Sequence, residues 1–206
     1  MTLNLFNQSG SQLASALDSK TTTDSDSATP SAVRLFPHSQ NNANDLLRPQ
    51  FWSRFALSEL NHSEWEALCD GCGSCCLIKY IDDDNVSDDH SHEAEMVEYT
   101  DVTCQLMDCA TGYCKHYATR QEHVPDCIQL TMENLPQMMW LPSHCAYKRL
   151  YKGQDLPSWH LLLTGDAVVT QQQMRAANVG VAGRCISEIG MTDEEMEERV
   201  VNWVQP

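Results

Sequence analysis

Hydrophobic and polar positions divide the chain near residue 49. Residues 1–48 are rich in Ser, Thr, Asn, Asp and Gln and show no sustained hydrophobic periodicity. A segment of this composition buries too little apolar surface to offset its conformational entropy. The pattern therefore predicts a disordered low-complexity tail over residues 1–48 and one folded domain over residues 49–206.

Short apolar groups after residue 49 predict several helices. Ser63 and Glu66 have the spacing of a capping box, so a short helix is expected to lead to Cys69, where Gly71 and Gly73 end it. Further helices are predicted over residues 132–141, 144–153 and 195–204. The second of these is expected to stop at Gly153, and the third to follow a capping box formed by Thr192 and Glu195.

Strand signals are confined to the middle of the chain. Residues 96–106 and 112–118 are rich in Val, Tyr and Thr, and a turn at residues 107–112 separates them. This arrangement predicts a β-hairpin. Together with the helices, it predicts a small α+β domain that is mainly helical and partly irregular.

The net charge of the chain limits the kinds of molecule that it is expected to bind. The formal net charge of −16 argues against nucleic acid and anionic membrane surfaces, which require clusters of Lys and Arg. No apolar run exceeds four residues, and the first twenty residues lack a continuous hydrophobic region, so we expect a cytoplasmic protein with no membrane partner. Residues 82–98 carry eight acids and no Lys or Arg. We interpret them as a solvated loop, with a cation site at His90 and His92 or a docking surface for a protein partner as alternatives.

Ten cysteines carry the candidate chemistry. In a reducing compartment, thiols are more often metal ligands or catalysts than disulfide partners. The densest group is CDGCGSCC at residues 69–76, whose CxxC spacing lets two sulfurs converge on one tetrahedral ion. Because adjacent side chains generally diverge, Cys75 and Cys76 are not expected to serve the same ion. Three thiols of the group would then share one centre and leave one spare.

Eight of the thiols are predicted metal ligands, and they are Cys69, Cys72, Cys75, Cys76, Cys104, Cys114, Cys127 and Cys145. They suffice for two zinc ions with four sulfurs each, or exceed the four that one iron–sulfur cluster needs. Cys109 and Cys185 stand apart from this pattern and are equally consistent with core residues. Asp70 and Asp126, each beside a cysteine, are candidate hydrogen-bond acceptors that orient the ligands. The nearby histidines are interpreted as surface or hydrogen-bonded residues, namely His116, His123, His144 and His160.

A redox dithiol is the main chemical alternative for the CxxC pair. Such pairs usually lie at a helix start in a βαβ context, which the pattern here does not predict. The many neighbouring carboxylates would also raise thiol pKa values and reduce reactivity, whereas a bound cation reverses that effect. No standard enzyme motif is present either.

Several segments together resemble the YcgN-like bacterial family, of the YkgJ type, whose members are described as zinc- or iron-chelating cysteine-cluster proteins. The matching stretches include EWEALCDGCGSCCL at 64–77, YTDVTC at 99–104, TGYCKHY at 111–117, PDCIQLT at 125–131 and ENLPQMMWLPSHCAYKRL at 133–150. The resemblance covers roughly residues 49–180, and its eight-cysteine pattern matches the eight ligands grouped above. It implies chelation and supplies no reaction.

The sequence thus predicts a metal-binding protein whose cofactor is zinc or iron, with an iron–sulfur cluster as one form of the latter. Two other classes remain open at this point. An iron or iron–sulfur redox enzyme would need an open coordination position, and a metal carrier or adaptor would hold a labile ion and dock on a protein partner. Whether the protein is an enzyme is not decided by the sequence.

Overall fold

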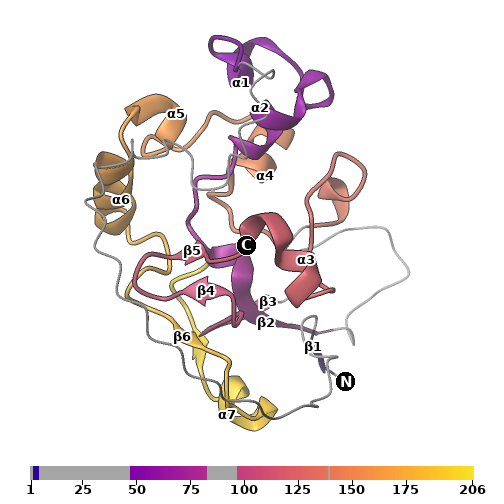
Figure 1. The fold of residues 1–206 in the computed structure, drawn as a ribbon, viewed down its shortest axis with the longest axis vertical. Helices are drawn as coiled ribbons and strands as arrows, with labels where there is room; N and C mark the ends of the chain where they lie inside the picture. Colours follow the sequence, from indigo (N-terminus) through magenta and orange to yellow (C-terminus); the bar gives the residue numbers. More distant parts are fainter. Residues whose placement is uncertain (1, 5–46, 83–96, 139) are drawn as a thin grey trace, which may run out of the picture.

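Helices and strands are mixed in the computed structural model, which describes residues 2–4, 47–82, 97–138 and 140–206 (Figure 1). This confirms the α+β class. None of the helices in these ranges is both long and apolar enough to cross a bilayer. The helices are α1 (Phe51–Arg54), α2 (His62–Glu66), α3 (Arg120–His123), α4 (Ala146–Tyr151), α5 (Leu161–Thr164), α6 (Ala167–Ala176) and α7 (Asp193–Glu197).

A five-stranded sheet forms the larger β unit. Its strands are β1 (Thr2–Asn4), β2 (Leu77–Asp82), β3 (Val97–Thr103), β6 (Ile186–Ser187) and β7 (Val200–Val201). Strand β3 is central, because β2 pairs with it antiparallel on one side while β7 (antiparallel) and β6 (parallel) share the other. A separate two-stranded sheet joins β4 (Met107–Asp108) to β5 (Tyr113–Cys114).

Side chains alternate between the two faces of β2 and β3, and both faces are covered. On one face, Leu77 and Tyr99 pack in a cluster with Met107, Val181 and Val204. On the other face, a second cluster buries four side chains, Ile78, Tyr80, Val102 and Met196. Figure 1 shows α7 at the lower end of the molecule, α1, α2 and α4 toward the upper end, and the β4–β5 hairpin between them.

A third hydrophobic cluster fills the helical end. Phe51 of α1, Leu68 and Tyr147 of α4 are all buried in it. Trp140 and Leu141 join them from the segment that precedes α4. This cluster anchors the helices on both sides of the cysteine motif, so the motif lies where the helical end meets the sheet.

Several local predictions are confirmed. Thr192 and Glu195 form the predicted capping box at the start of α7. Gly153 follows α4 and adopts a left-handed φ of 68°. A helix does lead to Cys69, but its capping box is Asn61 with Glu64, two residues before the predicted pair. Ser63 therefore lies inside α2.

Other local predictions are wrong. The helix expected over residues 195–204 ends at Glu197, because the β-branched pair at 200–201 adds to β3 as strand β7. Among the described residues of 132–141, which exclude 139, the helical structure is limited to the 3₁₀ turn Leu135–Gln137. The predicted hairpin partner of 96–106 is also wrong, since β3 pairs with β2 and the hairpin consists of β4 and β5 alone.

Two sequence interpretations fall largely outside the described residues. His90 and His92 and most of the acidic segment lie in 83–96, and most of the predicted tail lies in 5–46. The domain boundary at residue 49 stays a prediction. Arg48, just before that boundary, is firmly attached to the domain by contacts described below.

Candidate metal centre

The cysteine motif forms a tight loop between α2 and β2. Gly71 and Gly73 adopt left-handed φ angles of 71° and 74°. A 3₁₀ turn, Ser74–Cys76, then brings the adjacent thiols round before β2 begins. A Cβ atom at Gly73 would lie 2.5 Å from Cγ2 of Val181 and 3.0 Å from the carbonyl oxygen of Gly112. Only glycine fits there, because both the backbone angle and the space exclude a side chain.

Four further segments bring the remaining ligand candidates to this loop. Cys104 follows β3, and its backbone N–H donates to the carbonyl of Cys76 at 3.1 Å. Cys114 lies on β5, opposite Met107 of β4. Cys127 follows α3, and Cys145 is the N-cap residue of α4. The predicted ligands are thus delivered by both sheets and by two helix ends.

Six of the eight predicted ligands line one cavity of about 100 Å³. Aromatic side chains make up much of the remaining wall, namely Trp65, Tyr117, Trp140 and Tyr147. The six cysteines are Cys69, Cys75, Cys76, Cys104, Cys114 and Cys127. Cys72 and Cys145 do not line the cavity, although Cys145 packs against the same hydrophobic cluster as Cys69 and Cys75.

The adjacent thiols of Cys75 and Cys76 lie close together, although adjacent side chains were expected to diverge. The Sγ atoms of Cys75 and Cys76 lie 3.9 Å apart. Two sulfurs bound to one tetrahedral zinc at about 2.3 Å would lie about 3.8 Å apart. Within the described ranges, however, no three Cys, His, Asp or Glu side chains already converge at the spacing of a formed metal site.

The effects of the thiols on one another identify which of them are close. After burial, the charges of Cys75, Asp70 and Cys145 raise the pKa of Cys69. Burial, followed by Asp70 and Cys75, likewise raises the pKa of Cys145 to about 12. Cys72 is buried beside Asp70, Cys75 and Cys69, and its pKa is also raised. These four cysteines therefore form one neighbourhood.

A second neighbourhood lies on the other side of Cys75. Burial raises the pKa of Cys104 to about 11, and Cys127 and Cys114 add to the shift. Hydrogen bonding to Cys75 and then burial raise the pKa of Cys76, which also lies near Cys104 and Cys127. The charge of Cys75 reaches Cys127 as well, so the two neighbourhoods adjoin.

Lys79 places a positive charge beside the adjacent thiols. Its side chain is fully buried on β2, and its ammonium donates to the carbonyl of Cys75 at 3.1 Å. The same ammonium lies 4.3 Å from the ring centroid of Trp140, a cation–π contact. Burial lowers the pKa of Lys79 to about 8. Hydrogen bonding to Cys76, opposed by burial and helped by Lys79, lowers the pKa of Cys75 to about 7.

Asp70 orients the first half of the motif, as its position beside Cys69 suggested. Its Oδ1 accepts from the backbone N–H of Cys72 at 3.1 Å, and its Oδ2 accepts from the indole of Trp159 at 3.3 Å. His160 is fully buried and hydrogen-bonded, with Nε2 3.0 Å from the carbonyl of Leu68. The prediction of a hydrogen-bonded histidine is therefore confirmed for His160. Nε2 of His144, in contrast, is buried without a hydrogen-bond partner within the described part of the chain.

A polar group on the cavity wall was missed by sequence reasoning. The hydroxyl of Tyr117 donates to Oε2 of Glu66 at 2.7 Å. Arg120 donates to the carbonyl of Tyr117 at 2.6 Å, and its guanidinium lies 4.1 Å from the ring centroid of Tyr117. Burial and then the nearby charge of Cys69 raise the pKa of Tyr117. Nothing in the spacing of these residues signals that α2 and α3 meet here.

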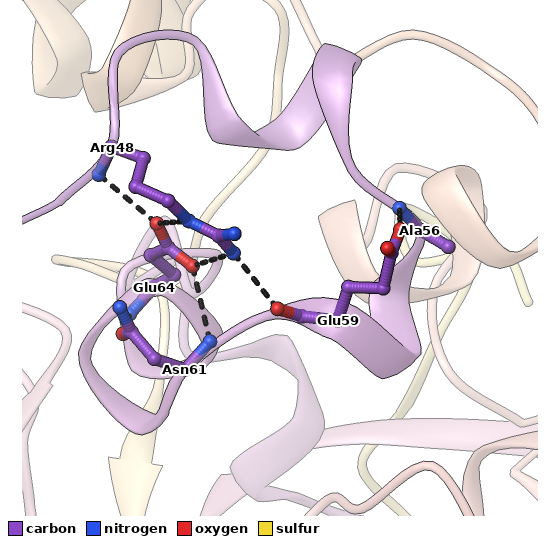
Figure 2. Close-up of polar contacts among 5 residues, drawn as sticks. All are labelled: Arg48, Ala56, Glu59, Asn61 and Glu64. Carbon is purple, nitrogen blue, oxygen red and sulfur yellow. Dashed lines mark hydrogen bonds and ion pairs between the residues drawn. The ribbon is translucent and has the colours of Figure 1, made fainter.

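An ion pair fixes the helix that leads into the motif. Glu64 of α2 is fully buried, and its carboxylate accepts from the backbone N–H and from Nε and Nη2 of Arg48 at 2.6–3.0 Å. Asn61 donates its backbone N–H to the same carboxylate at 3.0 Å (Figure 2). Arg48 also donates to the carbonyl of Glu59 and lies over the ring of Phe55. The chain before α1 is thereby fastened to α2.

Comparison with known proteins places this cysteine constellation in a recognised class. Residues 68–146 match the family model CxxCxxCC, described as "Putative zinc- or iron-chelating domain". The matched range contains all eight predicted ligands, and the model's name reproduces the spacing of Cys69, Cys72, Cys75 and Cys76. A metal-binding role fits this class.

The chain belongs to the UPF0260 family of bacterial proteins. A UPF0260 protein of Shewanella denitrificans is 44% identical over 153 residues, which cover 74% of this chain and 94% of the relative. Relatives in Shewanella pealeana (43%, over 74% of this chain and 94% of the relative) and Parvibaculum lavamentivorans (41%, over 74% and 92%) are similar to a comparable extent. No solved structure matches the chain. The finer YcgN-like assignment stays a prediction.

Proposed function

We propose that this protein binds zinc or iron through thiolates that line, or lie beside, the cavity formed by the cysteine motif, β5 and α3. The observation that carries the proposal is the convergence of six cysteines from four separate segments on one cavity. Thiolates are the preferred ligands of zinc and of iron–sulfur clusters. Burial of so many thiols without a cation is unfavourable for their charged forms, and a bound cation reverses that effect.

We further propose two adjoining centres, because eight sulfurs exceed the four positions of one tetrahedral ion. The eight cysteines then divide into two ligand sets, one for each centre. The boundary between the sets falls between Cys75 and Cys76, whose side chains pack against different hydrophobic clusters. The first set follows the neighbourhood around Cys69 and the second follows that around Cys104. The sets are Cys69, Cys72, Cys75 and Cys145, and Cys76, Cys104, Cys114 and Cys127.

The residues around the cavity support binding of a cation within a thiolate cage. Four thiolates around one divalent ion leave a net negative charge, and the buried ammonium of Lys79 lies beside both sets through Cys75 and Cys76. Asp70 holds the backbone N–H of Cys72, which fixes the loop for the first set. A metal bound here would cross-link the sheet to the helical end of the molecule.

We place this activity in the cytoplasm, where the thiols stay reduced and available as ligands. With four thiolates on each ion, neither centre would have an open coordination position for a substrate, which fits a structural or storage role. The iron–sulfur form differs in one measurable respect, since it contains acid-labile sulfide as well as iron.

Metal analysis of anaerobically purified protein tests the proposal. We expect two metal ions per chain in the wild-type protein and one in each of the variants Cys145→Ser and Cys114→Ser, which alter one set each. Cys109→Ser is the matched control, because Cys109 belongs to neither set, and it should retain both ions. Protein without bound metal would refute the function. Loss of all metal in either ligand variant would refute two separate centres and favour one cluster.

Cobalt substitution provides an independent readout of the ligands. Cobalt bound by thiolates gives intense sulfur-to-metal charge-transfer absorption in the near ultraviolet, so both single variants should show a reduced but present signal. Labile sulfide in the purified protein would identify the iron–sulfur form instead. Absence of charge-transfer bands in cobalt-loaded wild-type protein would contradict thiolate ligation.

A further inference from the structure

The two cysteines outside the ligand sets lie together. Cys185 is buried and Cys109 half-buried, and both belong to the hydrophobic cluster formed with Met107 and Val181. The backbone N–H of Gly183 donates to the carbonyl of Cys109 at 2.7 Å, which holds the chain just before Cys185 against the β4–β5 turn. Burial and hydrogen bonding to the Cys109 thiol raise the pKa of Cys185 to about 12.

The segment that carries Cys185 is wedged between two ligand-bearing elements. Val181 donates its backbone N–H to the carbonyl of Cys72 at 2.9 Å, and its side chain fills the space beside Gly73. On the hairpin side, a Cβ atom at Gly112 would lie 3.3 Å from Cβ of Ala182. Residues 180–185, here called the strap, therefore connect the cysteine motif to the β4–β5 hairpin that carries Cys114.

We propose that Cys109 and Cys185 are a redox pair that closes reversibly to a disulfide and ties the strap to the β4–β5 hairpin. The pair is separate from the eight metal ligands, so its oxidation leaves the thiolate cage intact. The bond would fix the spacing between the cysteine motif and the hairpin, and thus between segments that contribute to both ligand sets. That consequence for the metal rests on the proposed function, whereas the disulfide itself does not.

The reaction is a thiol–disulfide exchange with a small disulfide oxidant such as oxidised glutathione. The half-buried Cys109 attacks as thiolate, forms a mixed disulfide and releases one molecule of glutathione. The sulfur of Cys185 then attacks Cys109, the second glutathione leaves, and the proton of Cys185 passes to that leaving thiolate. Two thiols are oxidised to one disulfide, and oxidised glutathione is reduced to two thiols.

Disulfide mapping of the full chain tests this inference. The zinc-loaded protein is equilibrated with oxidised and reduced glutathione, alkylated and digested with trypsin, which releases Cys185 in a peptide, 185–199, that contains no other cysteine. We expect this peptide to be joined to the peptide that contains Cys109, with the loss of two free thiols per chain. Cys109→Ser should abolish the cross-link, and Cys185→Ser should leave glutathione attached to Cys109.

Two outcomes would overturn the inference. One is wild-type protein that carries glutathione on Cys109 without the cross-link, and the other is a cross-link from Cys185 that persists in Cys109→Ser. Metal content is measured on the same samples, so the two proposals fail separately. A chain that forms the cross-link but binds no metal refutes only the proposed function, and a chain that binds metal without the cross-link refutes only the redox pair.

If both proposals hold, closure of the pair should slow the loss of zinc to a chromogenic chelator. The comparison is between the oxidised and reduced wild-type protein, with Cys109→Ser treated in the same way as the control. The control should release zinc at one rate in both conditions. Equal rates for oxidised and reduced wild-type protein would refute the link between the strap and the metal, while the mapping result would stand.

Discussion

Replacement of Gly73 by alanine should destabilise the domain more than replacement of any exposed glycine with a similar backbone angle. The new methyl group would lie 2.5 Å from Cγ2 of Val181 and 3.0 Å from the carbonyl oxygen of Gly112. The left-handed φ of 74° adds a cost of about 1–2 kcal/mol for any residue other than glycine. Overpacking of a filled core adds about 1–3 kcal/mol more.

Gly153→Ala is the matched control for this change. Gly153 has a φ of 68°, and a Cβ atom there meets nothing within 4 Å, so the variant carries only the backbone cost. Urea unfolding followed by tryptophan fluorescence should therefore separate the two variants by about 1–3 kcal/mol. For a chain of this size, the corresponding difference in melting temperature is roughly 2–12 °C.

Gly73→Ala should also reduce metal content, because relief of the clash displaces Val181 or the loop that holds Cys72. Gly153→Ala should bind metal as the wild type does. Equal stability of the two variants would refute the reasoning, since it would mean that the strap is not packed against the cysteine motif.

Three further predictions concern single interactions. Hydrogen bonding to Arg48 lowers the pKa of Glu64 to about 2, from an ordinary value of 4.5, so this stabilisation is present above pH 4.5 and lost as pH falls toward 2. Glu64→Gln should accordingly lower the free energy of unfolding by about 2 kcal/mol at pH 7, and this loss should become smaller in acid. A loss that does not change with pH in urea unfolding would contradict the ion pair. Tyr117→Phe removes the hydrogen bond to Glu66 and should lower the free energy of unfolding by about 1–2 kcal/mol. Tyr151→Phe, at an exposed position, is the control and should leave the free energy of unfolding unchanged. Equal losses in the two variants would argue against the hydrogen bond. The pKa values of Cys104 and Cys145 are raised to about 11 and about 12, so each proposed centre must release at least one proton when zinc binds. The apparent zinc affinity should therefore rise at least about tenfold per pH unit near pH 7. Calorimetry in buffers of different ionisation enthalpy measures this proton release, and a result of no release would disprove the prediction.

Six of the eight cysteines that the sequence grouped line one cavity, whereas Cys72 and Cys145 do not. The role of all eight as metal ligands stays a prediction. The sequence could not show how these cysteines are divided between two metal centres. That division depends on where β3, β5 and α3 pack against the cysteine motif. The expectation that Cys75 and Cys76 diverge was wrong because a 3₁₀ turn replaces the helix or strand for which that rule holds. Their contact is a property of the turn.

Lys79 and strand β2 were missed for a related reason. Residues 77–82 are followed directly by the acidic residues of the next segment, so the sequence pattern did not predict a strand there. In the structure this strand is buried on both faces. From sequence alone, a lysine in such a strand is interpreted as a surface residue, whereas here the carbonyl of Cys75 and the Trp140 ring stabilise its buried ammonium. In the same way, the predicted helix at 195–204 failed because the edge of β3 was free to take Val200 and Val201.

The hydrogen bond from Val181 to Cys72 also bears on how the protein is made. The CxxCxxCC loop leaves the ribosome more than a hundred residues before Val181, which packs against it, and Val204 joins the same cluster later still. During synthesis the clustered thiols are therefore open to any soft metal ion that is present. The packing around the loop is complete only after residues 180–204 have been synthesised, so metal bound earlier is held without the support of the strap.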